Sequence, residues 1–135
     1  MSLTFMVAID GSKASYVAVE EAVKLFDRKR KDTIVLAHVH KNDHPSPAEA
    51  ALDMKIISTA QAKCEESAIQ PQILWEEGSN IAVELCTLAK NQAADYLLVG
   101  SRGFGGVTGS ILGSISQYCA THAKCPVIIC RAEEE

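Results

Sequence analysis

Thr33-Ile34-Val35-Leu36-Ala37-His38-Val39 is a short segment that carries apolar side chains at both its odd and its even positions. Successive side chains of a strand point to opposite faces of the sheet, so this segment is apolar on both faces. Both faces must then be covered, which is typical of a parallel strand between two layers of helices. The segment therefore predicts an α/β fold built on a parallel sheet.

Strand and helix patterns alternate on both sides of this segment. Before it, the apolar run Phe5–Ile9 ends at the turn Asp10-Gly11-Ser12, and residues 13–29 repeat apolar side chains at helical spacing. After it, Ser46-Pro47-Ala48-Glu49 offers an N-cap, a first-turn proline and a capping-box glutamate, which predicts a helix to about residue 67. The pattern continues with a strand over 72–76, a helix marked by Ile81, Leu85, Leu88 and Ala89, a strand over 95–100, a helix ending near 123, and a strand over 125–131.

This alternation predicts one doubly wound domain over residues 1–135. We expect a five-stranded parallel sheet in the order 3-2-1-4-5, with four helices distributed over its two faces. Ligands of such folds bind beyond the carboxyl ends of the strands, where the strand order reverses. That point lies between the first and fourth strands, so Asp10-Gly11-Ser12 and the loop after Gly100 should border the site.

Length and composition limit the classes of function. The 135 residues, 14.5 kDa, suffice for one hydrophobic core, since area scaling buries about two-thirds of the unfolded surface. A net charge of -4 and a pI of about 5.6 argue against non-specific binding to nucleic acid or an anionic membrane. No segment reaches the roughly 18 apolar residues of a membrane span, and the N-terminus lacks signal-peptide features. Five cysteines, an odd number without a C-x-x-C pair, favour a reduced, cytoplasmic location.

The basic run Arg28-Lys29-Arg30-Lys31 is bracketed by Asp27 and Asp32. Such a run can serve as a nuclear address or a phosphate patch. We interpret it instead as the solvated C-terminal end of the first helix, where cations complement the helix dipole.

The segment from Gly100 to Ser114 holds six of the eight glycines. Glycine permits close backbone approach to an anion, and Gly113-Ser114 would stand at a helix start, where free N–H groups favour a phosphate. Arg102 would sit at the mouth of this cradle. A glycine-rich loop can also be merely mobile, and composition leaves both interpretations open. The P-loop lysine motif and a G-x-G-x-x-G after the first strand are both absent.

The spacing Gly100-x2-Gly103-x9-Gly113-Ser114 resembles the G-x2-G-x9-G-[ST] signature of the ATP-binding branch of the universal stress protein family. The resemblance covers the whole chain and is closest to eukaryotic-type members. Besides the loop, the segments that carry it are Ala8–Ser12, His38-Val39, Ala94–Gly103, Leu112–Cys119, His122 and Cys125-Pro126-Val127.

The resemblance implies an adenine nucleotide alpha-hydrolase-like fold and an ATP site. Asp10 would lie near the ribose or phosphates, and the backbone of Val39 would bond adenine. The other residues implied are Ile9, Gly100, Ser101, Arg102 and Gly103 around the ribose and phosphates, and Gly113, Ser114 and Ile115 as phosphate donors. Mg²⁺ would be carried by the nucleotide. The resemblance also implies a homodimer through the apolar strand 126–131.

Three functions remain open from the residues alone. The first is an ATP-binding regulatory protein of the stress response. The second is an enzyme, a slow ATPase or nucleotidyl transferase. It is disfavoured because the sequence has neither a P-loop lysine nor an obvious carboxylate cluster that could hold two metal ions. The third is a nucleotide-free dimeric interaction module, which the intact glycine signature disfavours. Asp10 could be a catalytic base or a turn-capping carboxylate, and we assign no catalytic residue.

Two further side-chain groups have a functional and a structural interpretation. His38, His40 and His44, with Asp43, could hold a metal ion, but two strand-end histidines without a third firm ligand are weak evidence for zinc. We therefore assign no metal ligand. Cys119 and Cys125 could form a redox pair, although buried inert thiols are the simpler interpretation.

Overall fold

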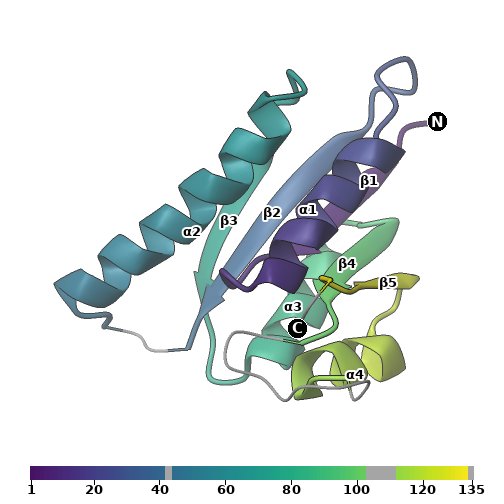
Figure 1. Cartoon of the computed structure of the whole chain (residues 1–135). Helices are drawn as coiled ribbons and strands as arrows, with labels where there is room; N and C mark the ends of the chain where they lie inside the picture. Colours follow the sequence, from purple (N-terminus) through teal and green to yellow (C-terminus); the bar gives the residue numbers. More distant parts are fainter. Residues whose placement is uncertain (42–43, 103–111, 134–135) are drawn as a thin grey trace.

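Strands and helices alternate throughout the part of the chain that the structure describes (Figure 1). The structure is a computed structural model, and it describes residues 1–41, 44–102 and 112–133. The elements are β1 (Thr4–Ala8), α1 (Lys13–Leu25), β2 (Thr33–His40), α2 (Pro47–Glu65), β3 (Gln72–Glu77), α3 (Ile81–Asn91), β4 (Tyr96–Gly100), α4 (Ser114–His122) and β5 (Val127–Cys130).

The five strands form one sheet in the order β3-β2-β1-β4-β5, and every pairing is parallel. The predicted strand order is confirmed. β1 is central: Met6 pairs with Val35 of β2 on one side and with Leu97 of β4 on the other. The chain therefore reverses its direction of winding between β1 and β4, as expected for a doubly wound sheet.

The sheet lies between α1 and α2 on one face and α3 and α4 on the other (Figure 1), and it separates two hydrophobic cores. On one face Val7 and Leu36 pack with Val19 of α1 and Ile57 of α2. On the other face the alternate strand residues, which include Met6, Val35, Val39 and Leu97, pack with Leu85 and Leu88 of α3 and Cys119 of α4. The period-two alternation of each strand thus fills both cores, which explains the apolar character of both faces of β2.

The helix starts follow the sequence signals. The Ser46 side chain accepts from the Glu49 backbone N–H at 3.2 Å, and the Glu49 carboxylate accepts from the Ser46 N–H at 2.9 Å, so the capping box is complete. Ser12 caps α1 by accepting from the Ser15 N–H at 3.1 Å. These local bonds satisfy donors that a helix leaves without intrahelical partners.

The C-terminal end of the first helix differs from the expectation. α1 ends at Leu25, and the basic run follows it in a turn rather than forming its last turn. The Asp27 carboxylate accepts from the Lys29 N–H at 2.9 Å, and Lys31 has a positive φ of 63°, which no helix continues through. Arg30 forms an ion pair with Asp32 at 2.6 Å, so one cation of the run holds the turn together.

The parallel arrangement brings the carboxyl ends of all five strands to one edge of the sheet. β1 and β4 are paired, so their carboxyl ends lie next to each other at this edge. Among the described residues, no helix combines the length and apolar character needed to cross a membrane.

Candidate functional site

A cavity of about 530 Å³ lies at the carboxyl ends of β1, β2 and β4, beside the starts of α1 and α4. Its volume is within the range usual for small-molecule sites. The wall includes most of the residues predicted from the sequence: Ile9, Asp10, Val39, Gly100, Arg102, Gly113, Ser114 and Ile115. Residues from four separate segments of the chain are therefore brought together where the strand order reverses.

One predicted residue that the structure describes, Ser101, is not in the wall. Ser101 is buried and lies behind it, where its carbonyl oxygen accepts from the Gly113 N–H at 2.7 Å and from the Ser116 hydroxyl at 3.0 Å. Its position is that of a support for the start of α4. Gly103 lies outside the described residues.

Asp10 is held at the cavity by the turn that starts α1. Its Oδ1 accepts from the Ser12 N–H at 2.9 Å, and Gly11 between them has a φ of 87°, which favours glycine. The Ser15 hydroxyl donates to the Ser12 carbonyl at 2.8 Å. The carboxylate therefore caps its own turn and also faces the cavity.

Gly100 is required by packing. A Cβ atom there would lie 2.8 Å from Cβ of Ala14 and 2.9 Å from the backbone nitrogen of Ser15. The first turn of α1 thus rests directly on the end of β4. Ser12 and Ser15 line the cavity together with Gly100.

The start of α4 forms the opposite part of the wall. Gly113 is its N-cap and makes no side-chain cap hydrogen bond. Gln117 donates the first intrahelical bond, to the Gly113 carbonyl at 3.0 Å. The N–H groups of Ser114 and Ile115 precede that bond, so they belong to the donors that a helix leaves for other partners.

The cavity also has an apolar part, which the sequence analysis identified incompletely. Ile81 and Leu85 of α3 lie with Val39 and Val99 in its wall. Their spacing predicted a helix, but which part of the core they contact depends on how α3 crosses the sheet. Ser12 lines the cavity, as expected of the turn Asp10-Gly11-Ser12 that borders the site. Ser15 and Ser116 also line it and were not predicted as site residues.

Charges of both signs reach the cavity. Asp10 and Arg102, the latter 8% exposed, both line it. The helix starts add partial positive charge from α1 and α4. Arrangements of this kind suit an anionic group next to an apolar ring.

The cysteines do not form a reactive centre. All five are free thiols. Burial raises the pKa of Cys64 and Cys130 to about 11 and that of Cys119 to about 12. Burial also raises the pKa of Cys86 and Cys125. A thiol must ionise to react, so these groups are poor nucleophiles near neutral pH, as the structural interpretation of Cys119 and Cys125 expects.

Comparison with known proteins gives a consistent family. The sequence profile described as Universal stress protein family matches residues 1–131. Universal stress protein YxiE of Bacillus subtilis is 29% identical over an alignment 145 residues long. The alignment covers 93% of this chain and 97% of that protein. Universal stress protein Rv2624c of Mycobacterium tuberculosis is 31% identical over 142 residues, 96% of this chain but 48% of the relative, so this chain spans about half of its length.

Solved structures share the fold. Universal stress protein UspA from Lactobacillus plantarum superposes with a TM-score of 0.80 at 22% identity, covering 96% of this chain and 97% of that one. A family protein from Arabidopsis thaliana with AMP bound has a TM-score of 0.73 at 24% identity, covering 98% and 93%. The universal stress protein from Archaeoglobus fulgidus in complex with dAMP has a TM-score of 0.78 at 15% identity, covering 95% and 97%.

Proposed function

The chain belongs to the universal stress protein family, and from this premise we propose that it is a regulatory, stress-response protein that binds an adenine nucleotide, ATP, in the cavity between β1 and β4. The observation that carries the proposal is the cavity, whose wall combines the start of α4 with an apolar part. A nucleotide needs both, because its phosphates are anionic and its base is flat and largely apolar.

The phosphates would lie at the start of α4. The N–H groups of Ser114 and Ile115, the Ser114 hydroxyl and the Arg102 guanidinium are the donors that this wall offers. The start of α1 borders the same cavity, so a chain of three phosphates finds partial positive charge at two helix ends. This favours ATP over a nucleotide with one phosphate.

Adenine would lie in the apolar part, against Val39, Ile81 and Leu85. The Ile9 N–H donates to the Ala37 carbonyl at 2.9 Å, so the Ala37 backbone is directed to the β1 side of β2. Strand backbone groups repeat this direction every second residue. The Val39 backbone is therefore directed to the same side, beyond the end of β1, which suits hydrogen bonds to the edge of adenine.

Magnesium would enter with the nucleotide. Among the described residues that line the cavity, Asp10 supplies the carboxylate. One carboxylate together with phosphate oxygens is a usual environment for Mg²⁺, whereas a two-metal catalytic site needs more acidic groups. We therefore propose binding with slow hydrolysis at most, so that occupancy by nucleotide is the signal.

The relatives' complexes support an adenine ligand, since the Arabidopsis thaliana protein holds AMP, the Archaeoglobus fulgidus protein holds dAMP and a further universal stress protein is in complex with cAMP. We propose that residues 1–135 act as one domain of this type. We also propose a homodimer through residues 126–131. β5 is an apolar edge strand, VIIC, while the other edge strand, β3, ends in Glu76-Glu77, and charge protects an edge from pairing.

The direct test has two measurements on the purified full chain. Mass spectrometry of the small molecules released by heat denaturation should find an adenine nucleotide. Isothermal titration with ATP, AMP and GTP, each with Mg²⁺, should give one saturable site that prefers ATP. The proposal fails if no adenine nucleotide is released and none binds more tightly than about 1 mM, a binding free energy of about 4 kcal/mol.

A further inference from the structure

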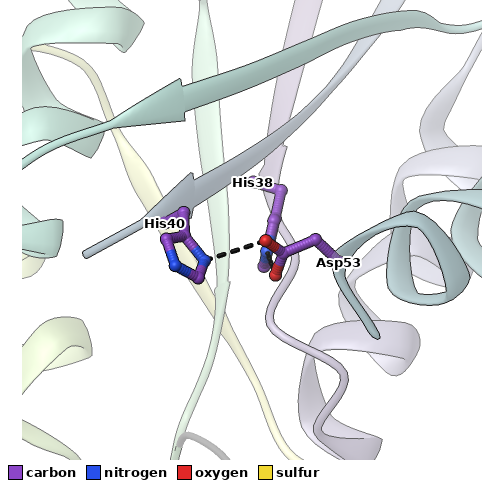
Figure 2. Close-up of side chains that lie close together, drawn as sticks. All are labelled: His38, His40 and Asp53. Atoms are coloured by element: carbon purple, nitrogen blue, oxygen red, sulfur yellow. Dashed lines mark hydrogen bonds and ion pairs between the residues drawn. The ribbon is translucent and has the colours of Figure 1, made fainter. Parts of the chain in front are cut away.

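Three polar side chains meet on the face of β2 that is turned away from the cavity (Figure 2). Val39 lines the cavity, and its neighbours His38 and His40 point to the opposite face because strand side chains alternate. There the carboxylate of Asp53 reaches them from α2. The sequence near the histidines offers no third firm ligand, and the fold supplies one from Asp53, 13 positions beyond His40.

The cluster is tight and buried. His38 Nε2 lies 2.7 Å from Asp53 Oδ1, and His40 Nδ1 lies 2.8 Å from Asp53 Oδ2. The side chains of His38 and Asp53 are each 7% exposed and that of His40 is 13% exposed. One ligand atom from each residue can be chosen so that all three lie within 4.8 Å of one another.

Asp53 stands where a helix of this kind normally has an apolar residue. It shares the buried face of α2 with Ile56, Ile57, Ala60 and Cys64, whereas its neighbours Leu52 and Met54 are exposed. Burying a carboxylate is costly unless it is paired or binds a metal. Asp53 is thus buried while the apolar side chains on either side of it in sequence are exposed, the reverse of the usual pattern. Such exceptions to the usual pattern are expected at functional sites.

The hydrogen bonds of His38 leave Nε2 ready to act as a ligand. Its Nδ1 lies 2.8 Å from the Ile9 carbonyl, which can only accept, so Nδ1 carries a proton. A histidine that binds a metal through one nitrogen commonly donates its other N–H to a backbone carbonyl in this way.

His40 is incompletely satisfied in the same cluster. Its Nε2 is buried and has no hydrogen-bond partner within the described ranges 1–41, 44–102 and 112–133. Rings in hydrogen-bonded clusters usually use both nitrogens. His44, which the sequence analysis grouped with them, is exposed, and Asp43 lies outside the described residues.

We propose that His38, His40 and Asp53 form a site for a divalent transition-metal ion, Zn²⁺, bound through His38 Nε2, His40 Nδ1 and the Asp53 carboxylate. Two imidazoles and one carboxylate are a known ligand set for zinc with one open position, here left to water. Ligand atoms about 2.0–2.1 Å from zinc are about 3.3 Å apart in a tetrahedron. The 2.7 and 2.8 Å contacts of Asp53 must therefore lengthen on binding, and any pair of ligand atoms as far apart as 4.8 Å must approach.

The site is independent of the proposed nucleotide site, because none of its three side chains lines that cavity.

The test uses full-length protein without a histidine tag, dialysed against a chelator, and ZnCl₂ alone as the probe, without nucleotide. Isothermal titration at pH 7.5 should give one zinc per chain. Co²⁺ as a spectroscopic substitute should give visible absorption bands of a low-coordinate site. Zinc should also raise the melting temperature.

The variants Asp53→Asn and His40→Gln should each weaken zinc binding at least tenfold, since even residues that only support a ligand contribute 10–100-fold. His44→Gln and His122→Gln are matched controls, because they change the two remaining histidines, both exposed, and should bind zinc as the parent does. Circular dichroism checks folding, and His40→Gln at the end of β2 is the variant least damaging to the core. The proposal is overturned if the parent binds no zinc at one equivalent, or if binding survives Asp53→Asn and His40→Gln.

Discussion

The position that a Cβ atom on Gly100 would occupy lies 2.8 Å from Cβ of Ala14, so the end of β4 and the first turn of α1 are as close as two backbones can pack. Gly100→Ala must push α1 outward, because the backbone nitrogen of Ser15 is also only 2.9 Å away. We expect a loss of about 1–3 kcal/mol in the free energy of unfolding, as for overpacked cores. Urea denaturation measures it. Gly78→Ala, whose new atom would meet the side chain of Glu84 at 3.1 Å, should cost less, and equal costs would contradict this account.

The start of α4 gives the second prediction. Gly113→Val places a branched side chain at the N-cap, in the cavity wall where the phosphates are proposed to lie. We expect ATP binding to be abolished in isothermal titration while circular dichroism shows a folded protein. Ala120→Val, at an exposed position of the same helix, is the control and should bind ATP normally. A Gly113→Val protein that binds as tightly as the parent would show that the phosphates lie elsewhere.

Asp32 makes stability depend on pH in a defined direction. The hydrogen bonds from the Arg30 side chain, with help from the Leu3 and Asp27 N–H groups, hold the pKa of Asp32 well below its usual range. The unfolded chain therefore binds this proton more readily than the folded one. The resulting stabilisation is present above the ordinary aspartate pKa of about 4 and is lost as the pH falls below it.

Asp32→Asn should accordingly lower the urea midpoint at pH 7, and the difference from the parent should shrink as the pH falls below about 4. Glu66→Gln, at an exposed position, serves as the control for removing one acidic group. A difference that is equal at pH 7 and pH 3 would mean that the charge of Asp32 plays no part.

The edge strand β5 tests the proposed homodimer. Val127, Ile128 and Ile129 are half-buried, and an isologous contact would cover their apolar edge. Ile129→Asp should shift the protein toward monomer in sedimentation velocity. Gln72→Asp, on the opposite edge strand, should leave the distribution unchanged. The parent protein should be measured at a concentration on the order of tens of micromolar, which is above the dissociation constants of typical stable dimers. Sedimentation as a 14.5 kDa monomer under these conditions would refute the dimer.

Turnover distinguishes a sensor from an enzyme. Fast hydrolysis needs a positioned water and charge neutralisation at the γ-phosphate, and the Asp10 carboxylate is already engaged in capping its own turn. We expect single-turnover hydrolysis of labelled ATP at about 10⁻³ s⁻¹ or slower. A rate above about 1 s⁻¹, the range of kinases, that disappears in Asp10→Asn while ATP still binds, would identify an enzyme.

Most of the fold could be predicted because its signals are local. Each of these signals involves residues that are close together in the sequence. Examples are the apolar run over Phe5–Ile9, the capping box at Ser46 and Glu49, and the helical repeat of α3. The right-handed crossover rule then leaves few topologies for such an alternation. The end of α1 was predicted four residues too late, because the Asp27 turn and the Arg30–Asp32 ion pair compete with a helix pattern that continues to residue 29.

The sequence by itself determined the α/β class, the order of elements and the segments that border the cavity, since strand ends of a parallel sheet must share one edge. Three features were decided by tertiary structure. Ser101 lies behind the cavity wall, and close packing against α1 leaves no room for a side chain at Gly100. Asp53 contacts His38 and His40. Each depends on how a helix is set against the sheet. That placement follows from the packing of many side chains distant in sequence, so no local pattern carries it.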